Sequence, residues 1–220
     1  MSVINRYYGN LEILTAEGIS ASHCFTTRFG GVSEGYLASM NLGTRRGDTI
    51  ENVRENYRIL GQAIGFSPEK LVLTRQTHTD VVRQVDGSHW GTGLFAPDFP
   101  PCDALITNTP GTALVVFTAD CTPILLHDPV TGAVGAVHAG WRGTAAKLGA
   151  KTVKAMQAAY GCRPEDICAA IGPNIAQCCF ETDGDVPAAM REAYGAGAED
   201  SIRAVGDKYY VNLKALNALS

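Results

Sequence analysis

Residues 104–140 read ALITNTPGTALVVFTADCTPILLHDPVTGAVGAVHAG, and this stretch decides the fold class. Four short apolar runs lie in it, separated by turn signals such as Asp128-Pro129. Runs this close together leave no room for helices, so they predict neighbouring strands of an antiparallel or mixed sheet. The runs are Ala104 to Ile106, Ala113 to Phe117, Pro123 to His127 and Ala133 to Val137.

Helical patterns occur on both sides of these strands. One helix follows an N-cap at Asp48 or Thr49 and ends at Gly65, because apolar residues recur at helical spacing between them. Two more are predicted over Thr144 to Tyr160 and Asp185 to Tyr194, with a short one at the end of the chain. Helices and close-set strands without regular alternation favour an α+β fold, a layered αβ sandwich with a mixed sheet, as a single domain over residues 1–220. Further strands are predicted at His23 to Phe29 (the first of the chain), Leu71 to Thr74, Val81 to Val85, Ile167 to Ile171 and Tyr209 to Val211.

Composition narrows the class of protein. The chain has 220 residues, 45% of them hydrophobic and 18% charged, which is typical of a globular domain. Its net charge of −4 gives no reason to expect nucleic acid or an anionic membrane as a partner. No apolar run approaches the roughly 20 residues that span a bilayer, and the N-terminus lacks the order of a signal peptide. Seven cysteines without the spacing of a disulfide framework fit a reducing compartment, so we expect a cytoplasmic protein; no oligomeric state is indicated.

Two apolar runs border residues that could carry chemistry. Cys121 lies beyond the end of the run that finishes at Phe117, and His138 lies at the end of the run Ala133 to Val137. Glycine, tryptophan and arginine follow His138. With His78 they make a candidate His/Cys/His site. Zinc accepts cysteine and histidine ligands and often leaves one position open for water. A cysteine nucleophile activated by histidine is the alternative. With zinc, Asp120 is a candidate for orienting a ligand or relaying a proton.

Other features point less directly to a site. Arg28, Arg45, Arg46 and Arg142 lie in glycine-containing loops, where a guanidinium could bind phosphate or carboxylate oxygens or merely clamp the loop. The adjacent pair Cys178-Cys179 is a further thiol candidate, although such pairs near a strand end are usually structural.

A set of ordered motifs resembles the laccase-domain family, once labelled multicopper polyphenol oxidases and now described as purine nucleoside phosphorylases. Some bacterial members are called peptidoglycan editing factors. The resemblance runs from about residue 23 to about residue 187. The motifs are Thr27-Arg28-Phe29-Gly30-Gly31-Val32-Ser33, Ser39-Met40-Asn41-Leu42-Gly43, Gln76-Thr77-His78, Thr118-Ala119-Asp120-Cys121, Val137-His138-Ala139-Gly140-Trp141-Arg142-Gly143-Thr144 and Ala170-Ile171-Gly172-Pro173-Asn174-Ile175.

The resemblance implies a fold like that of cysteine-hydrolase toxin domains and a zinc site on His78, Cys121 and His138. It also implies phosphorolysis of adenosine, inosine and methylthioadenosine, together with deamination of adenosine. Cys121, His138 and Asp120 are then the catalytic candidates, and the nucleoside and phosphate are the small-molecule partners. The laccase label fits poorly, because a multicopper oxidase needs many histidines and this chain has five. For substrate binding, the candidates are Arg28, Asn41 and Arg142.

Two departures from the family pattern matter. Gln76-Thr77-His78 stands where members usually have Gln-Val-His, which keeps the ligand. Members also continue past the position of Ser220 into a segment with Cys-Thr and Phe-Ser-Tyr-Arg, so either the chain is truncated or any pocket wall built by that segment is missing. Two further functions stay open beside the phosphorylase. The Cys/His chemistry leaves a metal-free Cys121/His138 amidase acting on cell-wall precursors, and the missing segment gives some weight to a non-catalytic binding domain.

Overall fold

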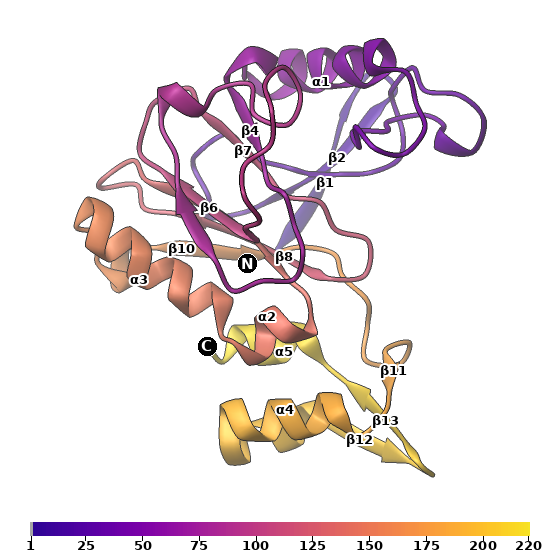
Figure 1. The fold of residues 1–220 in the computed structure, drawn as a ribbon, viewed down its shortest axis with the longest axis vertical. Helices are drawn as coiled ribbons and strands as arrows, with labels where there is room; N and C mark the ends of the chain where they lie inside the picture. Colours follow the sequence, from indigo (N-terminus) through magenta and orange to yellow (C-terminus); the bar gives the residue numbers. More distant parts are fainter. Residues whose placement is uncertain (1) are drawn as a thin grey trace.

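A five-stranded mixed sheet forms the centre of the computed structural model, which describes residues 2–220 (Figure 1). The strand order is β10-β8-β9-β6-β5, and only β5 and β6 run parallel to each other. This arrangement confirms the mixed sheet predicted from the apolar runs. The strands are β5 (Val82–Gln84), β6 (Ala104–Thr107), β8 (Thr122–His127), β9 (Val134–Ala139) and β10 (Cys168–Ile171).

The long helix α3 (Leu148–Tyr160) packs on the central sheet (Figure 1). Its buried Leu148 and Met156 contribute to the same hydrophobic cluster as Ile106, Ile124 and Val137 of the strands. These three strand residues lie on β6, β8 and β9, so the helix holds together the strands that border the candidate site.

Helix α1 (Ile50–Ile64) packs on two smaller sheets at the opposite end of the molecule from α4 (Figure 1). Its buried Tyr57 joins Leu71 in one cluster, and its buried Leu60 joins Leu11 in another. The Thr49 hydroxyl accepts a hydrogen bond from the Asn52 amide at its start, and Gly65 ends it at φ 85°, so both predicted ends are confirmed. The sheets are β1 (Val3–Tyr8), β2 (Leu11–Ala16) and β3 (Phe25–Thr26), and β4 (Leu71–Leu73) with β7 (Ala113–Val115).

A small lobe, residues 181–218, forms the other end of the molecule (Figure 1). Its strand order is β11-β13-β12, and the short helix α2 (Trp141–Ala145) packs against it through Trp141 and Ala145. The lobe consists of β11 (Glu181–Thr182), α4 (Asp185–Tyr194), β12 (Ile202–Val205), β13 (Lys208–Val211) and α5 (Leu213–Ala218). Single 3-10 turns lie at Gly35–Leu37, Pro68–Lys70, Gly87–His89 and Pro164–Asp166, with a longer one at Gly195–Ser201.

Three local predictions differ from the structure. The helix expected from Thr144 to Tyr160 is divided at Lys147, whose φ of 55° is left-handed. The division lets α2 pack against the small lobe while α3 packs against the central sheet. The run Ala113 to Phe117 is not part of the central sheet but forms β7, paired in parallel with β4. The first strand is not at His23, because a hairpin of β1 and β2 precedes it.

The fold class is confirmed as α+β, with several sheets and covering helices. Among the helices formed by residues 2–220, none has the length and apolar character required to cross a membrane.

Candidate metal centre

Strand pairing brings Cys121 and His138 together. In the antiparallel ladder of β8 and β9, Pro123 lies opposite His138 and Thr122 lies opposite Ala139. Cys121 directly precedes β8, so it comes beside the end of β9. The register therefore places a thiol and an imidazole from residues 17 positions apart at one edge of the sheet.

His78 reaches the same edge from the loop between β4 and β5. Its backbone is left-handed, with φ of 61°, which is uncommon for a residue other than glycine. The carboxylate of Asp103 stabilises this conformation by accepting hydrogen bonds from the amides of Thr77, His78 and Thr79, at 3.2, 3.1 and 2.8 Å. Asp103 directly precedes β6, so a strand of the central sheet fixes the position of the loop.

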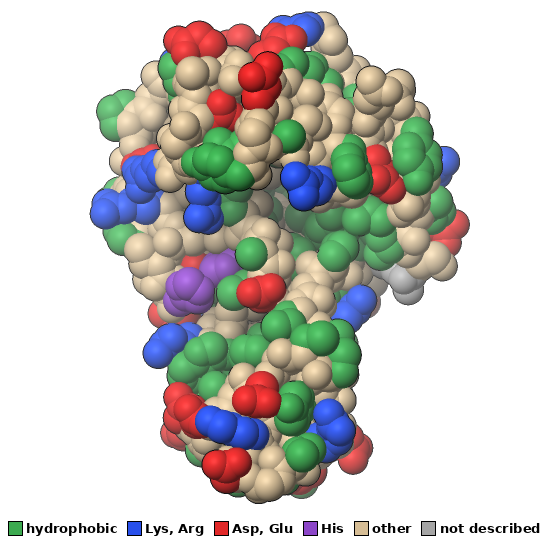
Figure 2. All heavy atoms as spheres, turned by 90° about the vertical axis from the view of Figure 1, so that its right-hand side faces the viewer, with side chains coloured by type: hydrophobic (Ala, Val, Ile, Leu, Met, Phe, Trp, Pro, Cys, Tyr) green, Lys and Arg blue, Asp and Glu red, His purple; other side chains and the backbone are tan. Residues whose placement is uncertain are grey.

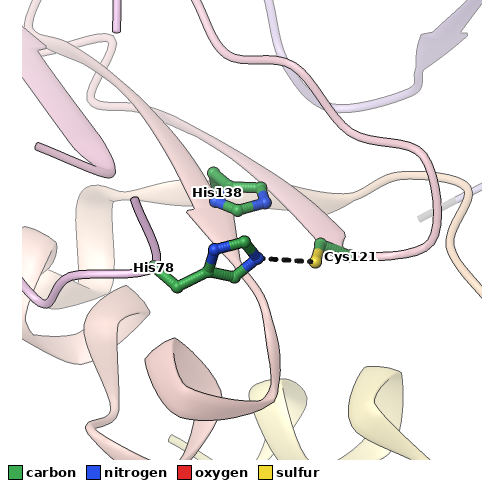
Figure 3. A group of neighbouring side chains, drawn as sticks. All are labelled: His78, Cys121 and His138. Atoms are coloured by element: carbon green, nitrogen blue, oxygen red, sulfur yellow. Dashed lines mark hydrogen bonds between the residues drawn. The ribbon is translucent and has the colours of Figure 1, made fainter. Parts of the chain in front are cut away.

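The three side chains converge on one point (Figure 3). One ligand atom of each lies within 4.8 Å of the others, and the Cys121 sulfur is 3.9 Å from His78 Nε2. The two imidazole rings have centroids 5.1 Å apart and planes at 70°. Zinc bonds of about 2.0 Å to nitrogen and 2.3 Å to sulfur need ligand atoms roughly 3.3–3.8 Å apart, so small side-chain shifts suffice. Within residues 2–220 this is the one such group of three His, Cys, Asp or Glu side chains.

Asp103 also orients His138. Its carboxylate lies 2.7 Å from His138 Nδ1, and both side chains are buried, with 0% and 5% of their surface exposed. A proton on Nδ1 leaves Nε2 free to bind a metal, as in the carboxylate–histidine pairs of many zinc sites. One buried carboxylate therefore contacts the ring of one candidate ligand and the backbone of another.

Hydrogen bonding sets the ionisation of this pair. Burial raises the pKa of Asp103, but hydrogen bonds from His138 and Thr79 outweigh it and lower the pKa to about 2. For His138, burial lowers the pKa, while the contacts with Asp103 and Cys121 raise it to about 9. In the metal-free protein His138 is therefore protonated near neutral pH, and a metal that binds its Nε2 must displace a proton.

Gly140 provides the space in which the ligands meet. A Cβ atom there would lie 2.8 Å from His78 Cδ2 and 3.1 Å from the Cys121 sulfur. Both distances are shorter than carbon and sulfur side chains normally tolerate. A side chain at Gly140, two residues after His138, would therefore force His78 and Cys121 to shift.

The site is open to solvent at the junction between the small lobe and the large body, which is the rest of the molecule. Figure 2 shows histidine side chains at the surface between the large body and the small lobe. Of the candidate ligands, His78 is exposed, Cys121 is half-buried and His138 is buried. A small molecule can thus approach the cluster from solvent, while the opposite side is closed by the central sheet.

Asp120 does not contact the candidate ligands through its side chain in the way that Asp103 does. Asp120 has an exposed side chain, and its backbone carbonyl accepts a hydrogen bond from the Ile175 amide at 2.9 Å. The contact to a candidate ligand comes from Asp103, which the sequence interpretation missed. An acidic residue directly before a buried apolar run was the only sign of it, and only two residues separate Asp120 from another such run.

The candidate substrate residues are partly engaged with the protein. Arg28 donates two hydrogen bonds to the carbonyl of Ala38, at 3.0 and 2.7 Å, and Arg142 is exposed, with its guanidinium over the Trp141 ring. Asn41 donates to Asp48 at 3.0 Å. Hydrogen bonds from Ser33, Asn41 and Asn52 lower the pKa of Asp48 to about 2. Of the other loop arginines, Arg45 pairs with Asp98, and the Arg46 carbonyl accepts from Tyr36.

The fold and the cluster define a class: a single α+β unit with an accessible His/Cys/His group at a sheet edge. The family model described as multi-copper polyphenol oxidoreductase laccase matches residues 22–220. The chain belongs to this family, which confirms the resemblance seen in the motifs.

Two relatives in sequence carry a common name, and a solved structure shares the fold. A protein from Deinococcus radiodurans named purine nucleoside phosphorylase is 42% identical over 83% of this chain and 68% of its own length. A protein of the same name from Bacteroides thetaiotaomicron is 39% identical over 78% of this chain and 64% of its own. The crystal structure of YlmD from Geobacillus stearothermophilus matches with a TM-score of 0.90 and 33% identity, covering 99% of this chain and 83% of that one. The chain thus spans about two thirds of the two named relatives.

Proposed function

We propose that this chain is a zinc-dependent purine nucleoside phosphorylase, with adenosine, inosine and methylthioadenosine as substrates, and that it also deaminates adenosine. The observation that carries the proposal is the cluster itself, with three ligand atoms within 4.8 Å of one another. It occurs in a family whose relatives are named purine nucleoside phosphorylases, which supplies the substrate class.

The residues present fit zinc. One cysteine and two histidines are donors that zinc prefers, and three protein ligands leave room for a fourth. Asp103 holds the Nδ1 of His138, so that its Nε2 points to the other two ligand atoms. Bound zinc would supply a Lewis acid, which polarises a substrate oxygen and makes a water molecule more acidic.

For phosphorolysis, phosphate replaces the purine at C1′ of the ribose, so the glycosidic bond breaks as a C1′–oxygen bond forms. We assign the phosphate oxygens to Arg28 and Arg142, because guanidinium groups bind them in a fixed geometry. Asn41 contacts the nucleoside in this proposal, and Asp120 relays a proton to the departing base. These roles are supported by residue chemistry and by the exposed positions of Arg28, Arg142 and Asp120.

The test combines metal content with turnover. Purified protein is analysed for zinc and assayed with inosine plus phosphate and with adenosine. We expect one zinc per chain and hypoxanthine release that requires phosphate, both lost in Cys121→Ala. The matched control is Cys178→Ala, which removes an exposed thiol outside the cluster and should keep both properties.

Other results would select the alternatives. Activity on a cell-wall amide without metal, abolished when iodoacetamide alkylates Cys121, would replace the proposal with a cysteine hydrolase. The position of the Cys121 sulfur, within 4.8 Å of the His138 ligand nitrogen, is the observation that keeps this Cys121/His138 alternative open. Absence of both metal and turnover would leave a binding domain.

A further inference from the structure

Two exposed cysteines lie side by side outside the candidate metal centre. Cys178 and Cys179 are in the connection between β10 and β11, and their sulfurs are 3.4 Å apart. They are the two exposed thiols among the seven free cysteines, whereas Cys102 and Cys162 are buried. A structural pair would be packed in a core, so the structure removes the ordinary explanation for adjacent cysteines here.

The distance between the sulfurs suits a reaction between them. A disulfide is about 2.05 Å long, so the two atoms must approach by little more than 1 Å. A mixed disulfide formed on one thiol is also attacked quickly by the other, because this second attack is intramolecular. Adjacent Cα atoms are closer than in most disulfides, which strains the bond and makes it easy to reduce.

The same turn is bonded to the residue before Cys121. The Ile175 amide donates to the Asp120 carbonyl at 2.9 Å, and the amides of Cys179 and Phe180 both donate to the Ala176 carbonyl. On the other side, the Gln177 side chain donates hydrogen bonds to the carbonyls of Ser201 and Tyr210 in the small lobe. The turn is therefore hydrogen-bonded to Asp120 on one side and to the small lobe on the other. A change in the backbone at residues 178–179 would be transmitted to both.

We infer that Cys178 and Cys179 form a modification site for small-molecule disulfides, and that their oxidation changes the environment of Cys121. One thiolate attacks the small disulfide, which gives a mixed disulfide and releases one small thiol. The neighbouring thiol then attacks the protein sulfur of that bond, forms the Cys178–Cys179 disulfide and releases the second small thiol. Two electrons pass from the protein to the small disulfide, and the two protons end on the released thiols. This inference goes beyond the proposed function and does not depend on it.

The first measurement tests the site. The full chain is treated with oxidised glutathione, and the peptide that contains both cysteines is analysed by tandem mass spectrometry. We expect a peptide about 2 Da lighter, from the two hydrogens lost on oxidation. In Cys178→Ser, Cys179 should instead keep a stable glutathione adduct. Stable adducts on the wild-type pair, or an unmodified pair, would overturn the site.

The second measurement tests the link to Cys121. The rate at which iodoacetamide alkylates Cys121 is measured in metal-free protein before oxidation, after it, and after reduction with dithiothreitol. We expect a change of at least about threefold that reverses on reduction, and no change in Cys178→Ser. Equal rates in oxidised and reduced wild type would overturn the link while leaving the modification site intact.

Discussion

At the scale of single residues, Asp103 determines the geometry of the cluster. Its buried carboxylate accepts from the backbone of residues 77–79 and from His138 Nδ1. Two of three candidate ligands therefore depend on one side chain that binds no metal itself. Replacing a residue that holds a metal ligand in this way generally lowers the metal affinity by a large factor.

Replacing Asp103 by Asn should weaken zinc binding by about 10- to 100-fold. The amide keeps the shape but loses the charge that orients His138, and its nitrogen cannot accept the loop amides. Zinc affinity is measured by competition with a chelator at fixed pH. Asp86→Asn is the control, because Asp86 is an exposed carboxylate that bonds Ser88 and His89 instead. Unchanged affinity in Asp103→Asn would contradict this role.

The ionisation of His138 predicts a pH dependence of stability in the metal-free chain. The pKa of His138 is about 9 in the folded chain and 6.5 in an unfolded chain, so the folded state binds the proton more tightly. The resulting stabilisation is fully present below pH 6.5 and is lost as pH rises through 9, by about 3 kcal/mol. Urea unfolding in EDTA at pH 6 and pH 9 measures it. His138→Gln should lose this contribution, and an identical pH dependence in the variant would refute the assignment.

Gly140 can be tested by adding a single carbon. Gly140→Ala puts a Cβ against His78 and Cys121, so we expect zinc affinity to fall at least about tenfold. Gly143→Ala is the matched control, since its Cβ would meet its nearest neighbours at an ordinary 3.6 Å and alanine favours the helix. Equal affinities for the two variants would show that the site tolerates the side chain.

Sequence alone could identify Cys121 and His138 as strand-end residues, but it could not place His78 beside them. That position depends on a left-handed residue and on Asp103, neither of which has a spacing signature. Only the ordered family motifs suggested the third ligand. Asp120 and Asp103 both precede apolar runs, and local pattern could not show which carboxylate turns toward His138.

At the scale of elements, the β8–β9 register and α3 support the site. Met156 is fully buried between α3 and the sheet, so Met156→Ala should lower the free energy of unfolding by about 2–4 kcal/mol. Urea unfolding measures the loss. Lys154→Ala, on the exposed side of the same helix, should change it by less than about 0.5 kcal/mol. A comparable loss in both variants would contradict the packing described for α3.

The sequence predicted helices and strands correctly where local patterns were strong, and incorrectly where tertiary contacts determine the bounds of an element. The ends of α1 at Thr49 and Gly65 follow from capping chemistry. The hairpin of β1 and β2 was missed although Gly9-Asn10 is a recognised two-residue turn between strand-like runs. The break at Lys147 has no breaker residue, because it arises from packing against two different cores.

At the scale of the whole molecule, the candidate centre lies where the large body meets the small lobe (Figures 1 and 2). The three ligands come from three separate segments that only the assembled sheet brings together. Metal binding therefore reports on the complete fold as well as on the site.

The most direct test of the account is X-ray absorption at the zinc edge on the purified, zinc-loaded chain. We predict one sulfur at about 2.3 Å and nitrogen ligands at about 2.0–2.1 Å, including two histidines. The sulfur contribution should disappear in Cys121→Ser and remain in Cys178→Ser. A zinc spectrum without sulfur, or one with sulfur that survives loss of Cys121, would contradict the assignment of His78, Cys121 and His138 as the metal centre.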